Sequence, residues 1–123
     1  MDKVIRIDDQ DVEFRATART PRLYRVIIGR DMIVDMNKLS RKYKEVSEAK
    51  INGENETEFT ADDLQIFEDA AYVMARHANP DMEEKTADEW LDKFDMFSIY
   101  TILPDLLILW GQNQKTTSTP KKK

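Results

Sequence analysis

WLDKFDMFSIYTILPDLLILW, residues 90–110, is the most apolar segment of this chain, and a polar tail that ends in three lysines follows it. Because 35% of all residues are charged, the remaining apolar side chains are too few to cover this segment on every side. Part of the segment is therefore expected to bind a partner, and part to belong to the core. The large aromatic residues divided between these two roles are Trp90, Phe94, Phe97, Tyr100 and Trp110.

The spacing within this segment predicts a final helix whose N-terminal cap is Asp95. Pro104 lies inside the predicted helix and should kink it, and Gly111 is expected to end it. One face of the helix carries aromatic and leucine side chains at helical spacing. Together with the two aromatic residues that precede the helix, they make up the predicted partner-binding set: Trp90, Phe94, Phe97, Tyr100, Leu103, Leu107 and Trp110.

Two helices are predicted immediately upstream. Thr60 is a good N-terminal cap, and the apolar stripe that follows it extends to Ala78. Thr86 and Glu89 have the spacing of a capping box, in which each side chain accepts a hydrogen bond from a backbone N–H of the first turn. This pattern predicts a short helix that continues through Phe94.

The first half of the chain contains a predicted β-hairpin and a predicted long helix. Residues 3–7 and 12–17 alternate apolar and polar side chains and flank a short polar turn, which is typical of a hairpin. After Thr20-Pro21, apolar residues recur at helical spacing as far as Tyr43, which predicts one helix with a bend at Gly29. The polar residues 44–58 are expected to form a loop.

These patterns predict a mainly α fold, a small helical domain with a short N-terminal β-hairpin and a disordered C-terminal tail. A chain of 123 residues is expected to form one domain. That domain is predicted to cover residues 1–113, with the hairpin in 1–18 and the helices in 20–113. Residues 114–123 are predicted to be a disordered, lysine-rich tail because their composition cannot bury enough apolar surface to offset the entropy of ordering.

The composition argues against an enzyme and against a metal or cofactor site. There is no cysteine, the three glycines form no phosphate-binding loop, and His77 is the only histidine. A nucleophile–base pair or a zinc cluster therefore lacks the residues it needs. No secretion signal is apparent, and residues 96–110 are too short and too polar for a membrane helix, so an intracellular protein is expected.

Charge is unevenly distributed along the chain. Residues 1–50 carry 12 lysines and arginines against 9 acids, whereas residues 51–110 carry 3 against 15. Five arginines without an intervening acid form a candidate patch for self-association or for an acidic partner; the alternative is an ordinary helix face paired with the acidic half. Nucleic-acid binding is disfavoured by that acidic half. The patch comprises Arg15, Arg19, Arg22, Arg25 and Arg30.

Three segments are specific in combination. They are FRATARTPRLYR at 14–25 leading to Gly29-Arg30-Asp31, AAYVMA at 70–75, and WL at 90–91 followed by FDMFSIY at 94–100 and LWG at 109–111. In order and spacing the chain resembles the tail assembly chaperones of long, non-contractile-tailed phages and prophages of Gram-positive bacteria. The resemblance covers about residues 12–111.

The resemblance implies a helical, non-enzymatic protein of the host bacterial cytoplasm that is absent from the mature virion. It would bind and solubilise the tape measure protein, help to recruit tail tube subunits, and associate with its own copies, without contacting nucleic acid or membrane. Members of the family often gain an extension by a programmed −1 frameshift, and Lys121 begins a lysine run compatible with one. The alternatives are a small helical DNA-binding regulator or another protein-interaction adaptor.

Overall fold

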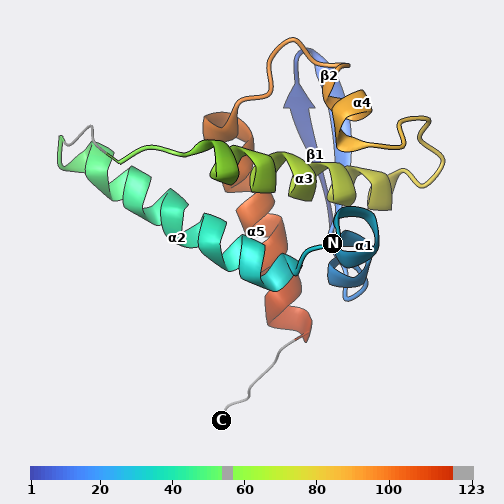
Figure 1. Cartoon of the computed structure of the whole chain (residues 1–123), viewed down its shortest axis with the longest axis horizontal. Coiled ribbons are helices and arrows are strands. Elements are labelled where there is room, and N and C mark those ends of the chain that lie inside the picture. The colour runs from blue at the N-terminus through green and yellow to red at the C-terminus, as the bar shows by residue number, and fades with distance from the viewer. Residues whose placement is uncertain (54–56, 118–123) are drawn as a thin grey trace.

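The computed structural model describes residues 1–53 and 57–117, and it confirms a mainly helical fold with an N-terminal two-stranded hairpin (Figure 1). Two antiparallel strands come first, and five helices follow within the described residues. The elements are β1 (Asp2–Ile7), β2 (Gln10–Arg15), α1 (Thr20–Ile28), α2 (Met32–Ile51), α3 (Ala61–Ala78), α4 (Ala87–Leu91) and α5 (Ile99–Thr117).

The hairpin turns through Asp8 and Asp9, which have φ angles of 54° and 65°. Two consecutive residues with positive φ are typical of the tight turn whose twist matches that of the flanking strands, and aspartate tolerates this conformation. The Asp8 carboxylate also accepts hydrogen bonds from the backbone N–H groups of Asp95 and Met96, which fixes the segment before α5 against the turn. The buried face of the hairpin carries Ile5, Ile7, Phe14 and, just beyond β2, Ala16.

α1 and α2 are separate helices, so the prediction of one long bent helix is wrong. Gly29 has a φ of 89°, and its N–H donates to the carbonyls of Tyr24 and Arg25, which ends α1. The Asp31 side chain then accepts from the N–H groups of Ile33 and Val34 and starts α2. The left-handed Gly29 and the capping Asp31 therefore divide into two helices the residues that apolar periodicity alone predicted to be one.

α2 extends to Ile51, so the predicted loop over residues 44–58 is wrong in its first half. Val46 and Ala49 are buried, and this apolar spacing of three residues continues the inner face of the helix. Residues 54–56 of the predicted loop lie outside the described residues.

α3 is the central element of the fold and contacts β2, α1, α2, α4 and α5 (Figure 1). Its predicted start is confirmed: Thr60 Oγ1 accepts from the N–H of Asp63, and the Asp63 carboxylate accepts from the N–H of Thr60. Six consecutive residues, 70–75, are buried, because neighbouring elements cover α3 on several sides.

The predicted cap of α4 is also confirmed, since Thr86 Oγ1 accepts from the N–H of Glu89. α4 nevertheless ends at Leu91, short of the predicted Phe94. α5 begins at Ile99 rather than after Asp95, whose N–H is already bound by the hairpin turn.

α5 continues through Pro104 and Gly111 to Thr117, so the expected stop at Gly111 is wrong. Residues 114–117 of the expected tail belong to the last turn of this helix. The rest of that tail, residues 118–123, lies outside the described residues. Among the described helices, none has the length and apolar character needed to cross a membrane.

Candidate partner-binding surface

Three of the seven predicted partner-binding residues are core residues, which corrects the sequence prediction. Trp90, Leu103 and Trp110 are all at least 95% buried. Trp90 packs edge-on against Phe14 of β2 and lies 6.0 Å, between ring centroids, from Tyr72 of α3. These side chains hold the helices and the hairpin together and present no surface to a partner in this conformation.

α5 is apolar around nearly its whole circumference, which explains why sequence periodicity did not separate its two sides. Six side chains face the interior, and in an α-helix each residue advances about 100° around the axis. The opposite side of the helix therefore remains open to solvent. The interior side consists of Ile99, Ile102, Leu103, Leu106, Leu109 and Trp110.

The solvent side of α5 carries Tyr100, Pro104, Leu107 and Ile108, which together are termed the open face of α5. Tyr100 is 51% exposed and Ile108 is 54% exposed, while Pro104 and Leu107 are half-buried. At about 100° per residue these four positions fall within an arc of about 100°. An apolar stripe of this width is what a helix normally turns toward a packing partner. The predicted partner-binding residues Tyr100 and Leu107 both belong to it.

Pro104 sits on this open face without interrupting the helix. Proline has no N–H, so the carbonyl of Tyr100, four residues earlier, lacks its usual helical donor. Because this side of α5 faces solvent, water can satisfy that carbonyl at little cost. The residue after Pro104 is Asp105, whose carboxylate lies 3.9 Å from Lys3 Nζ of β1. This ion pair turns the one acid of α5 toward the hairpin.

Tyr100 connects the open face to the neighbouring end of α2. Lys50 Nζ lies 4.4 Å from the centroid of the Tyr100 ring, and the Phe59 ring packs edge-on at 5.6 Å. Ile51, the last residue of α2, is 84% exposed. Phe59 and Lys50 therefore border the open face at Tyr100.

Phe94 and Phe97 are half-buried and lie at the boundary between the core and the surface. Both rings pack against Trp90, at 5.2 and 5.3 Å between centroids, and Phe97 also contacts Phe67 of α3. Each ring therefore has one face in the core. Met96 between them is mostly exposed, although it was not among the predicted partner-binding residues.

The predicted arginine patch is not a continuous surface. Arg15 is bound to Asp2 across the hairpin at 2.9 Å, and Arg30 is half-buried in an ion-pair network. Only Arg19, Arg22 and Arg25 are exposed. The prediction for Arg15 and Arg30 is therefore corrected, because both already have carboxylate partners within the chain.

The Arg30 network joins α1, α2 and α3. Arg30 Nε donates to Asp35 Oδ2 at 2.8 Å, and Nη2 donates to Asp69 Oδ2 at 2.8 Å and to the Tyr24 hydroxyl at 3.0 Å. The Tyr24 hydroxyl in turn donates to Asp35 Oδ2 at 2.6 Å. Burial opposes the charge of Arg30, but the hydrogen bonds that Arg30 donates to the two carboxylates raise its pKa. Burial also raises the pKa of Asp69, and Arg30 opposes that rise.

His77 near the end of α3 makes a structural hydrogen bond. Its Nε2 lies 2.8 Å from Thr17 Oγ1, which links α3 to the segment after β2. Burial lowers the pKa of His77, and the nearby Arg15 and Arg19 lower it further. Across residues 1–53 and 57–117 no group of three or more His, Asp or Glu side chains is arranged to hold a metal ion.

No protein-family model, curated protein or solved structure matches this chain. The likeness to tail assembly chaperones therefore remains a resemblance carried by the three sequence segments.

Proposed function

We propose that this protein is a non-enzymatic phage tail assembly chaperone that binds an amphipathic helix of the tape measure protein along the open face of α5. The observation that carries the proposal is the apolar open face of α5 in a chain rich in charge, where Tyr100 and Ile108 are exposed and Pro104 and Leu107 are half-buried. A helix laid along this stripe would bury apolar area on both partners, at roughly 25 cal/mol for each Å².

The proposal includes the host cytoplasm as the site of action and absence from the finished virion. Tail tube subunits are the second proposed partner, recruited through an extension that a −1 frameshift near Lys121 would add. Association with further copies of the chain is also proposed, with Arg19, Arg22 and Arg25 as the remaining exposed basic residues. The DNA-binding alternative has less support, because Arg15 and Arg30 are engaged within the chain.

Co-expression with the tape measure protein tests the proposal. The Tyr100→Ser/Ile108→Ser variant should leave the client in the insoluble fraction, while the wild-type chain keeps it soluble. A matched control, Val26→Ser/Val34→Ser, removes two aliphatic residues of α1 and α2 that are even more exposed, and it should behave as wild type. Circular dichroism of each variant establishes that it is folded.

Two outcomes would reject the proposal. Wild-type protein that fails to keep the client soluble would remove the chaperone function. A folded α5 variant that works as well as wild type would show that client binding, if present, uses another surface. Duplex DNA shifted by the wild-type chain at physiological salt would favour the regulator instead.

A further inference from the structure

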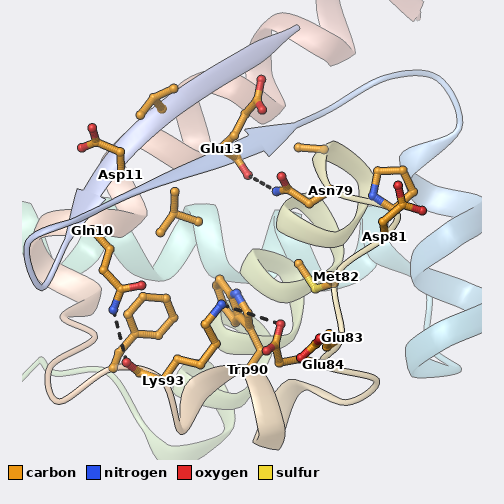
Figure 2. Close-up of a pocket in the computed structure, with 15 residues that line it drawn as sticks. Gln10, Asp11, Glu13, Asn79, Asp81, Met82, Glu83, Glu84, Trp90 and Lys93 are labelled. Atoms are coloured by element: carbon orange, nitrogen blue, oxygen red, sulfur yellow. Dashed lines mark hydrogen bonds and ion pairs between the residues drawn. The ribbon is translucent and has the colours of Figure 1, made fainter.

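A groove of about 870 Å³ runs beside β2, on a different part of the molecule from the open face of α5 (Figure 2). Residues 10–13 of β2 form one wall, and residues 78–84, which end α3 and lead toward α4, form the other. Figure 2 shows the Trp90 ring rising from α4 toward β2 between these walls. Met82 and Phe94, which are both half-buried, give the groove an apolar floor, and Trp90, which also lines it, is only 2% exposed.

The wall formed by β2 is a strand edge, as the hairpin register shows. The amino group of Met1 donates to the carbonyl of Ala16 at 3.0 Å, and the N–H of Ala16 donates to the carbonyl of Met1 at 2.9 Å. Hydrogen-bonded pairs alternate along an antiparallel ladder, so Val12 and Phe14 also bond to β1. The backbone groups of the alternate residues, Asp11 and Glu13, point away from β1, toward the groove.

Most of these outward groups are free. The carbonyl of Glu13 accepts from Asn79 Nδ2 at 3.3 Å, in the place that an N–H of a third strand would take. At the other end of the groove, Gln10 Nε2 donates to the carbonyl of Lys93 at 3.3 Å. Between these two side chains, the N–H and carbonyl of Asp11 and the N–H of Glu13 have no hydrogen-bond partner in the part of the chain that the structure describes.

The groove is strongly acidic. Five carboxylates and one lysine line it, and the lysine, Lys93, is already 3.7 Å from Glu84. Glu13, Asp81 and Glu83 form no ion pair with any described residue. An occupant that carries lysine or arginine would neutralise these charges, whereas an acidic segment would be repelled. The five carboxylates belong to Asp11, Glu13, Asp81, Glu83 and Glu84.

We propose that this groove is a second docking site, which takes an extended segment of another protein, rich in lysine or arginine, as a third strand on the outer edge of β2. The backbone of the segment pairs with Asp11 and Glu13, its small apolar side chains lie over Met82 and Phe94, and its basic side chains meet the acidic walls. The site is independent of client binding by α5, so either can fail without the other.

Fluorescence anisotropy of the full-length chain with a labelled seven-residue peptide of alternating lysine and valine tests the proposal. The peptide should bind saturably at low salt, and its glutamate–valine counterpart should not. Asp81→Lys/Glu83→Lys should weaken binding about tenfold or more. Glu45→Lys/Glu48→Lys makes the same charge change on exposed positions of α2 and should leave binding within about twofold of wild type.

Backbone methylation distinguishes strand pairing from plain charge attraction. Two further peptides carry N-methyl groups on the lysines only or on the valines only. Successive N–H groups of a strand point to opposite edges, so one of the two methylated peptides should lose binding and the other should keep it. The indole N–H resonance of Trp90, assigned with a Trp110→Phe variant, should shift when the unmethylated peptide binds.

Several results would overturn the proposal. The proposal fails if the peptide does not bind the wild-type chain, if both methylated peptides bind equally, or if the Asp81 and Glu83 changes have no effect on binding. A chain that ends at Thr117 provides a last comparison. If removal of residues 118–123 raises affinity for the peptide, then the lysine-rich end of the chain itself occupies the groove. That result would contradict a partner segment as the occupant.

Discussion

Replacement of Arg30 by alanine should destabilise the protein far more than replacement of its exposed neighbour Arg25. The change leaves the buried Asp35 and the half-buried Asp69 without their cation, and it leaves three acceptors of the network with one donor fewer. Breaking a buried ion pair in this way typically costs about 3–5 kcal/mol. Because the Arg30 side chain is 37% exposed, solvent screening reduces the expected loss to about 2–3 kcal/mol.

Urea denaturation followed by circular dichroism measures this loss. Arg25→Ala is the matched control and should change the free energy of unfolding by less than about 0.5 kcal/mol. In an Asp69→Asn background one of the stranded charges is already gone, so Arg30→Ala should cost about 1 kcal/mol less there.

Acid should partly rescue the Arg30→Ala variant. Burial raises the pKa of Asp69 in the folded protein, and loss of Arg30 removes the group that opposes this rise. Asp69 of the folded variant then binds a proton at a higher pH than Asp69 of the unfolded chain. The free energy of unfolding should therefore increase as the pH falls through the folded pKa toward the unfolded value of 3.8. Equal stability losses for Arg30→Ala and Arg25→Ala would refute the structural role of the network.

Three further predictions concern stability. His77 has a lowered pKa, so the unfolded chain binds its proton first and stability should decline as pH falls below 6.5; His77→Gln should flatten that part of a pH series of urea melts. Leu103→Ala should cost about 2–5 kcal/mol, and Ile108→Ala under about 1 kcal/mol, because only the former leaves a cavity; similar values in thermal melts would contradict the assigned faces of α5. Thr60→Ala removes half of a capping box and should cost about 1 kcal/mol, with Ser40→Ala as an exposed control in the same denaturation assay.

Local sequence signals predicted the hairpin and α3 correctly. Strand alternation and a two-aspartate turn suffice for the hairpin, and Thr60 with Asp63 forms the cap of α3 from residues three apart. The division between α1 and α2 was missed although its signals are also local. The apolar period continues across Gly29, and only the cap by Asp31 shows that a second helix starts.

The candidate site was less predictable, because it depends on tertiary packing. α5 is apolar on nearly all sides, so its sequence does not indicate that Leu103 and Trp110 face the core while Tyr100 and Ile108 face solvent. The role of Arg30 likewise depends on Asp69, which is 39 residues away in sequence. Side-chain type identified the candidates, but only the arrangement of the helices separates surface from interior.

The most direct test of the chaperone proposal is site-specific photo-crosslinking during tail assembly in the host. A photoreactive phenylalanine analogue at Ile108 lies on the open face of α5, and the same analogue at Glu48 lies on an exposed part of α2. The proposal predicts a crosslink to the tape measure protein from position 108 and none from position 48. Crosslinks to the tape measure protein from neither position, or equally from both, would contradict it.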